Sequence, residues 1–125
     1  MSTLERLSLW NNTLTGSIPP ELAQLTGLDY LTVAVNNFTG SIPPEFGFMP
    51  RMQYLFFAHN QLSGMVPDTM RNLNQTLARL KLDDNNLSGT FPSYFETNFQ
   101  WLAEFTYIDN NFTTDVVVID IEGAG

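Results

Sequence analysis

Apolar residues recur along this chain in one fixed frame. From Leu4 the frame has apolar residues at its first, fourth, sixth and eleventh positions and an asparagine at its ninth. It starts again at residues 28, 52, 77 and 102, so successive copies are 24, 24, 25 and 25 residues apart. Five slots in five copies, 25 positions in all, follow the frame with no polar residue in an apolar slot and no missing asparagine. Such self-similarity at a fixed period indicates a solenoid in which one small unit is stacked.

Each copy of the frame predicts one short β-strand. Its central triplet, such as Leu7-Ser8-Leu9, alternates as a strand does when one face is buried. Stacked copies would place these strands about 4.8 Å apart in one parallel sheet. The asparagine lies where the chain turns inward after the strand, and its amide can satisfy backbone groups of neighbouring turns. We therefore expect a structural ladder along the solenoid, formed by Asn12, Asn36, Asn60, Asn85 and Asn110.

The second half of each copy is regular as well. It combines a glycine with one or two prolines, as in Thr15-Gly16-Ser17-Ile18-Pro19-Pro20. Glycine permits a bend that a side chain would obstruct, and proline favours an extended backbone at an outer edge. Pairs of apolar residues three or four positions apart follow, such as Leu22 and Leu25. This spacing predicts one short helical or 3₁₀ turn that packs inward.

These residues resemble the plant-specific class of leucine-rich repeat, whose consensus is close to LxxLxLxxNxLTGxIPxxLxxLxx. Residues 4–27 and 28–51 match it almost throughout, and the resemblance covers roughly nine-tenths of the chain. The chain is similar to the ectodomains of plant receptor-like kinases and receptor-like proteins, and to polygalacturonase-inhibiting proteins. The resemblance implies an α/β-type solenoid, a right-handed superhelix. Its parallel β-sheet lines the concave face, and short 3₁₀ or helical turns and extended proline-containing segments form the convex side.

We expect a single repeat domain over residues 1–115 and an irregular tail or partial terminal strand over residues 116–125. Ectodomains of the family usually begin and end with cysteine-paired caps, and this sequence has no cysteine. The chain is therefore expected to be a section of a larger protein, flanked there by neighbouring repeats or caps. As five uncapped repeats, it is expected to be marginally stable in isolation and to self-associate.

The charge balance argues against several kinds of partner. The chain has 13 acidic and 5 basic residues and a formal net charge of -8. Binding of nucleic acid or of an anionic membrane needs clustered basic side chains. Here they are scattered along the sequence, as Arg6, Arg51, Arg71, Arg79 and Lys81. No apolar run reaches the roughly 20 residues of a membrane helix, and the first residues lack the pattern of a signal peptide. We expect no binding to nucleic acid and no direct membrane insertion by this segment.

Positions between the inward apolar slots predict a binding surface. Strand alternation turns them out of the expected concave face, where a rigid repeat aligns them in columns. Exposed aromatic residues often mark interfaces, and we expect such a cluster from Trp10, Tyr30, Tyr54 and Phe56. The alternative is that these rings pack against one another or against upstream repeats. The same face is expected to carry Arg6, His59, Arg79 and Lys81.

The last two repeats give this face an acidic half, made of Asp83, Asp84, Glu104 and Asp109. Carboxylates in such a group can steer a basic peptide, or weakly hold Ca²⁺ through oxygen ligands. An ordinary set of solvated charges is the simpler interpretation, and we favour it. No cofactor and no metal ion is expected.

Five Asn-x-Ser/Thr sequons agree with a secretory origin: Asn11, Asn37, Asn74, Asn86 and Asn111. Four of them arise from the repeat itself. Asn74 lies in Asn-Gln-Thr on the expected outer side and is independent of the repeat, so it is the preferred glycan site. We expect the chain to act outside the cell or at the cell surface, within a larger secretory protein.

The sequence favours a non-catalytic module that binds a protein or peptide on its concave face. It has no P-loop, no dinucleotide-binding glycine motif and no nucleophile motif, and His59 has no partner at catalytic or metal-ligand spacing. By resemblance, we expect a section of an extracellular receptor-like protein or receptor kinase ectodomain. A soluble inhibitor of a secreted enzyme and a free-standing intracellular scaffold are the alternatives. Ice binding would need a regular threonine array, and the column Ser8, Thr32, Phe56, Lys81 and Thr106 is too mixed.

Overall fold

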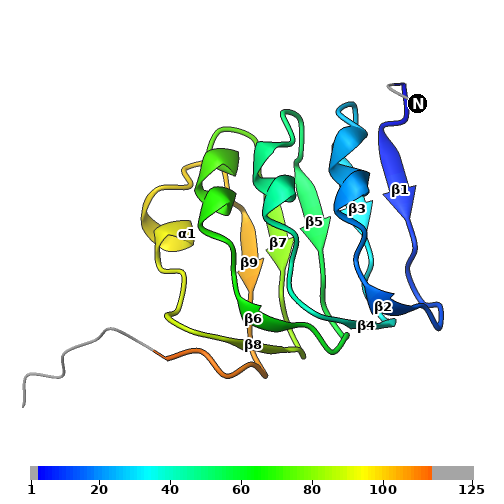
Figure 1. Cartoon of the computed structure of the whole chain (residues 1–125). Helices are drawn as coiled ribbons and strands as arrows, with labels where there is room; N and C mark the ends of the chain where they lie inside the picture. The colour runs from blue at the N-terminus through cyan, green and yellow to red at the C-terminus, as the bar shows by residue number, and fades with distance from the viewer. Residues whose placement is uncertain (1–2, 114–125) are drawn as a thin grey trace, which may run out of the picture.

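A five-stranded parallel sheet runs through the computed structural model, which describes residues 3–113. The tail expected at residues 116–125 lies outside the described residues. The strands are β1 (Arg6–Ser8), β3 (Tyr30–Thr32), β5 (Tyr54–Phe56), β7 (Arg79–Lys81) and β9 (Glu104–Thr106). They lie side by side in chain order, as Figure 1 shows from blue to orange. Each central residue aligns with its counterpart one repeat later, so Leu7 pairs with Leu31 and Leu80 with Phe105. The predicted strand in every repeat is confirmed.

Short helical turns follow the strands on the far side of the solenoid, as predicted. Three are 3₁₀ turns, η1 (Pro20–Gln24), η2 (Pro44–Phe48) and η3 (Asp68–Leu73), and the fourth is a single α-helical turn, α1 (Tyr94–Thr97). A proline in an extended conformation precedes each 3₁₀ turn, at Pro19, Pro43 and Pro67. Proline suits this place because its fixed φ leads into the turn and its missing N–H has no helical partner to lose. No helix in the described residues is long and apolar enough to cross a membrane.

The glycine-containing segments form additional sheets that the sequence does not predict. Strand β2 (Thr15–Ser17) pairs in parallel with β4 (Asn37–Thr39), and β6 (Ser63–Met65) pairs in parallel with β8 (Asn86–Ser88). These pairs lie below the main sheet in Figure 1. The backbone is extended here as expected, and the extended segments also hydrogen-bond to one another.

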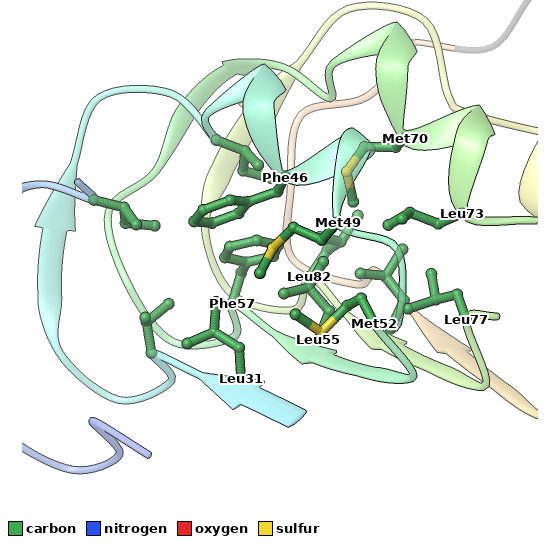
Figure 2. Packing of buried hydrophobic residues seen from close by; sticks show 14 of the residues in the cluster. Leu31, Phe46, Met49, Met52, Leu55, Phe57, Met70, Leu73, Leu77 and Leu82 are labelled. Atoms are coloured by element: carbon green, nitrogen blue, oxygen red, sulfur yellow. The ribbon is translucent and has the colours of Figure 1, made fainter. Parts of the chain in front are cut away.

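The apolar core fills the space between the main sheet and the helical turns. Phe46 from η2 stacks on Phe57, which follows β5, with ring centroids 6.0 Å apart. Figure 2 shows methionine and leucine side chains packed around this pair. Leu31, Leu55 and Leu80 are fully buried, whereas their counterparts in the first and last repeats are only partly buried. The apolar side chains of a repeat are therefore fully buried only where a neighbouring repeat covers them on each side.

The ladder asparagines join each repeat to the one before it. Asn36 Nδ2 donates to Leu9 O at 2.8 Å, and Asn36 Oδ1 accepts from the Leu14 N–H at 3.1 Å. The later ladder residues repeat both bonds, namely Asn60, Asn85 and Asn110. Asn12 differs, because among residues 3–113 its Nδ2 donates only to carbonyls of its own turn. The buried amide thus satisfies backbone groups that an apolar side chain would leave unpaired.

Candidate functional site

The register of the main sheet aligns its outward side chains in columns. We call this outward side the sheet face. One column contains Arg6, Tyr30, Tyr54, Arg79 and Glu104, and its neighbour contains Ser8, Thr32, Phe56, Lys81 and Thr106. Residues of one column are separated by a whole repeat along the chain but by one strand spacing in space, about 4.8 Å. The sheet face is therefore where residues distant in sequence become neighbours.

Three of the four expected aromatic residues are in contact. The Tyr30 and Tyr54 rings have centroids 6.1 Å apart, and the Tyr30 and Phe56 rings meet edge to face at 5.7 Å. Both geometries are favourable for aromatic pairs. Trp10 has no such ring contact within the described residues, and its side chain is 57% exposed. The aromatic cluster thus consists of Tyr30, Tyr54 and Phe56, with Trp10 standing apart.

Basic side chains lie over each ring of this cluster. The Arg6 guanidinium lies 4.5 Å from the Tyr30 centroid, and Arg79 lies 5.9 Å from that of Tyr54. Lys81 Nζ lies 5.5 Å from the Phe56 centroid and 3.8 Å from a Glu104 carboxylate oxygen. Arg6, Arg79 and Lys81 are scattered along the sequence, but parallel stacking of their strands gathers them on this face.

We call these six residues the cation–aromatic patch: Arg6, Tyr30, Tyr54, Phe56, Arg79 and Lys81. Cation–π contacts orient the basic groups over the rings. In a chain of net charge -8, the patch gathers three of the five basic residues in one place. A negatively charged group beside an apolar side chain is the ligand chemistry that such a patch complements.

A hollow of about 390 Å³ adjoins the patch along the same face. Its floor is made of small side chains, Thr32, Ala34 and Ala58, which are only 2%, 7% and 4% exposed. Trp10 and His59 are among the larger residues that line it. Strand alternation places these small residues on the outward side, where they line the hollow, but they are almost fully covered.

A second hollow, of about 610 Å³, lies over the patch itself. The six patch residues line it together with Asp29 and Gln53. Tyr30, Phe56 and Lys81 line both hollows, so the two hollows are neighbours on the sheet face across β1 to β7. Both hollows are open to solvent on one side.

The expected acidic half is only partly assembled. Asp84 Oδ2 lies 3.0 Å from His59 Nδ1, and both side chains are more than half exposed. Asp83 lines the first hollow, and its Oδ1 is buried without a hydrogen-bond partner in the described residues. Within residues 3–113, no three His, Cys, Asp or Glu side chains come together in a way that could hold a metal ion. His59 thus forms an exposed hydrogen bond with Asp84 in this structure.

A column of left-handed residues borders the sheet face, and the sequence does not predict it. The residue before each ladder asparagine has a φ of 55° to 60°: Asn11, Val35, His59, Asp84 and Asp109. Asn and Asp tolerate this conformation, whereas a β-branched residue such as Val35 rarely adopts it. The Asn and Asp at three of the five positions are the signal from which this backbone feature could have been found.

Four of the five sequon asparagines are exposed, namely Asn11, Asn37, Asn86 and Asn111. The preferred candidate, Asn74, ends η3 and is only half-buried rather than fully exposed. Asn111 Nδ2 donates to Asn86 Oδ1, so these two sequons are immediate neighbours. Accessibility thus favours the repeat-borne sequons over Asn74 as glycan sites.

Comparison with known proteins gives one family match. The family described as Leucine Rich Repeat matches residues 3–25, 27–49, 51–73 and 76–98, which is more than half of the chain. The matched residues end before the fifth repeat, whose strand β9 pairs with β7 in the structure. No curated protein sequence matches the chain.

Solved structures of plant proteins are similar to this fold. The ectodomain of the Arabidopsis receptor kinase HAESA, solved with an IDA peptide hormone, is 32% identical with a TM-score of 0.79 over 89% of this chain. A TDR receptor is 33% identical with a TM-score of 0.84 over 90% of this chain. A plant ice-binding protein is 27% identical with a TM-score of 0.81 over 87% of this chain. This chain covers 18%, 19% and 35% of those three chains, respectively.

Proposed function

Because this chain belongs to the leucine-rich-repeat family, we propose that its sheet face is a non-catalytic binding surface for a peptide or an extended protein segment. The cation–aromatic patch is the observation that carries the proposal. Rigid aromatic rings supply contact area at low entropic cost, and arginine and aromatic residues dominate the energetics of interfaces. The two neighbouring hollows across β1 to β7 provide room for an extended ligand.

The chemistry of the patch indicates the ligand class. Arg6, Arg79 and Lys81 would attract a carboxylate, while Tyr30 and Phe56 would contact an apolar side chain beside it. The acidic remainder of the protein would repel other parts of a strongly acidic ligand. We therefore infer a peptide with one or two acidic residues next to an apolar one.

The proposed setting is an extracellular receptor-like protein or receptor kinase, of which this chain would be a section. Support comes from the similar Arabidopsis receptor ectodomain, which was solved with a peptide hormone. A soluble inhibitor of a secreted enzyme would use the same face against a protein target. An intracellular scaffold is the third setting, and the exposed sequons favour the first two over it.

Ice binding is the rival suggested by one similar structure. It requires a flat, regular array of hydroxyl groups. On the sheet face, the second column is interrupted by Phe56 and Lys81, and Thr32 is only 2% exposed. These features favour a peptide ligand.

Selection from a library of random linear peptides tests the proposal. The full chain alone would be the bait, and the affinity of each enriched peptide would then be measured for the unchanged chain and for a Tyr30→Ser variant, because Tyr30 contacts both other rings. We expect enriched peptides with an acidic residue beside an apolar one, bound at least about tenfold more weakly by the variant and more weakly at high salt. Phe48→Ser is the matched control, since Phe48 lies in η2 and is 69% exposed. Peptides that bind Tyr30→Ser as well as the unchanged chain would overturn the proposal.

A further inference from the structure

We propose that the first hollow of the sheet face binds one long basic side chain of the ligand, a lysine or an arginine, and that Asp83 supplies its counter-charge. This subsite rests on the proposed function, because it would bind another residue of the same peptide. Three features carry it. One column of outward residues has a gap, an exposed aromatic ring stands at one end of the gap, and a carboxylate without a partner in residues 3–113 stands at the other end.

The gap lies in the column of residues that stand two positions before the ladder asparagines. This column runs from Trp10 over Ala34 and Ala58 to Asp83, and all four residues line the hollow. Trp10 is 57% exposed, whereas the two alanines are 7% and 4% exposed, so two successive repeats raise almost nothing above the sheet. From Trp10 to Asp83 there are three strand spacings, about 14 Å. A lysine or arginine side chain, about 6–7 Å long when extended, can lie in this gap.

Apolar surface in the gap suits the methylene stem of a basic side chain. The two alanines form the floor, and the Trp10 and Phe56 rings line the hollow beside them. Lysine and arginine bury their stems along such surface while the charged end stays in a polar place. An uncharged side chain of the same length would gain the same apolar burial. Selection of a basic side chain therefore depends on the charges around the hollow.

The charges around the hollow leave Asp83 without a counter-charge. Lys81 Nζ lies 3.8 Å from a Glu104 carboxylate oxygen, and His59 Nδ1 is hydrogen-bonded to Asp84 Oδ2 at 3.0 Å. Both basic side chains that line the hollow thus have acidic partners. Within residues 3–113 Asp83 has no ion pair, and its Oδ1 is buried without a hydrogen-bond partner. A partly buried carboxylate in this state is unfavourable, and a ligand cation would relieve it.

The position of the hollow beside the cation–aromatic patch limits the spacing of charges in the ligand. Tyr30 in the patch and Ala34 in the gap are four residues apart in one repeat, an interval of at most about 13 Å. An extended peptide covers this distance with about four residues. We therefore expect the basic residue of the ligand within about four positions of its acidic residue. A ligand with both charges also suits a chain whose net charge of -8 repels a wholly acidic peptide.

Defined peptides test the subsite. Each would contain an aspartate followed by a leucine, with lysine, arginine, glutamine or norleucine placed three positions before or after the aspartate. Norleucine has the stem of lysine without its charge. We expect the lysine or the arginine peptide, in at least one placement, to bind at least about fivefold more tightly than its norleucine counterpart, and the difference to shrink at about 0.5 M salt. The comparison of lysine with arginine shows which basic group the hollow prefers.

An Asp83→Asn variant assigns the preference to its carboxylate. It should bind the basic peptide within about twofold of the norleucine peptide, and the norleucine peptide as the unchanged chain does. Glu45→Gln is the matched control, because it removes the same charge from an exposed residue of η2 and should keep the preference. Circular dichroism would show that both variants are folded.

The outcomes separate this subsite from the proposed function. Equal affinities for the basic and norleucine peptides, still weakened by Tyr30→Ser, would overturn the basic subsite and leave the proposed function standing. A preference for the basic peptide that persists in Asp83→Asn would overturn the role of Asp83. Binding of none of these peptides would count against both proposals.

Discussion

Backbone strain at single residues is concentrated just before the ladder asparagines. In each of the first four repeats, the residue in the left-handed region donates its N–H to the next repeat, as Val35 does to Ala58 O at 3.0 Å. This bond holds the backbone in a conformation that a β-branched side chain disfavours by about 1–2 kcal/mol. The identity of the residue at this position therefore contributes to stability independently of the core.

Replacing Val35 with asparagine should stabilise the protein. Asparagine tolerates the positive φ, so we expect the free energy of unfolding in urea to increase by about 1 kcal/mol. The reverse change at the equivalent position, Asn11→Val, should lower it by a similar amount. If Val35→Asn leaves the free energy of unfolding unchanged while Asn11→Val lowers it, the contacts that Val35 makes in the hollow contribute as much as relief of its backbone strain would.

Tyr94 gives stability a pH dependence at high pH. Burial raises the pKa of Tyr94 to about 12 from 10.0; the Arg71 guanidinium, 4.0 Å from the ring centroid, opposes this rise, and the nearby Asp68 carboxylate adds to it. A group whose pKa is higher in the folded than in the unfolded state contributes its full stabilisation of the fold at any pH below the unfolded-state pKa. This stabilisation is lost as the pH rises through the folded-state pKa. Between pH 10 and 12, the unchanged chain should therefore lose about 1–2 kcal/mol relative to Tyr94→Phe. Denaturation of both proteins at each pH measures this difference, and a constant difference would contradict it.

At the scale of elements, the repeat frame predicts the main strands and the helical turns because each depends on apolar residues at fixed spacing. The pairing of β2 with β4 is not predictable in this way, since Thr15-Gly16-Ser17 carries no apolar alternation. Parts of the sheet face were predicted, because strand alternation alone turns Tyr30 and Tyr54 outward. The sequence also placed Arg6 and Arg79 on this face, but it did not predict that they lie over the Tyr30 and Tyr54 rings, because that depends on side-chain conformations set by contacts between strands.

Packing between successive helical turns depends on a residue without a side chain. A Cβ atom at Gly47 in η2 would overlap the backbone carbonyl of Thr69 in η3. Gly47→Ala should therefore destabilise the chain by about 2–3 kcal/mol, although alanine has the higher helix propensity. Gly16→Ala is the control, because nothing lies within 4 Å of its Cβ position and only its positive φ opposes the change, at about 1 kcal/mol. Equal melting temperatures for the two variants would count against this packing.

For the whole molecule, stability should vary along the solenoid. Each repeat contacts its neighbours only, and the fully buried side chains belong mainly to the interior repeats. Amide hydrogen exchange should therefore be slowest around Leu31, Leu55 and Leu80, and fastest around Leu7 and Phe105. We expect at least about a tenfold difference in exchange rate at concentrations where the chain is monomeric. Uniform protection would mean that the five repeats unfold as one cooperative unit.

The spacing of the strands differs from the spacing of residues in any extended ligand that crosses them. Strands succeed one another about every 4.8 Å, whereas an extended peptide advances about 3.3 Å per residue. The length of two strand spacings is nearly that of three ligand residues. Every third residue of the ligand therefore takes the same position relative to a strand in every second repeat. From β1 to β7 there are three strand steps, about 14 Å, which is the length of about four ligand residues. A recognition motif read by the cation–aromatic patch would therefore be short and follow a three-residue rhythm. Because this match recurs every two repeats, duplicating one repeat would shift the ligand positions that match by half of that period.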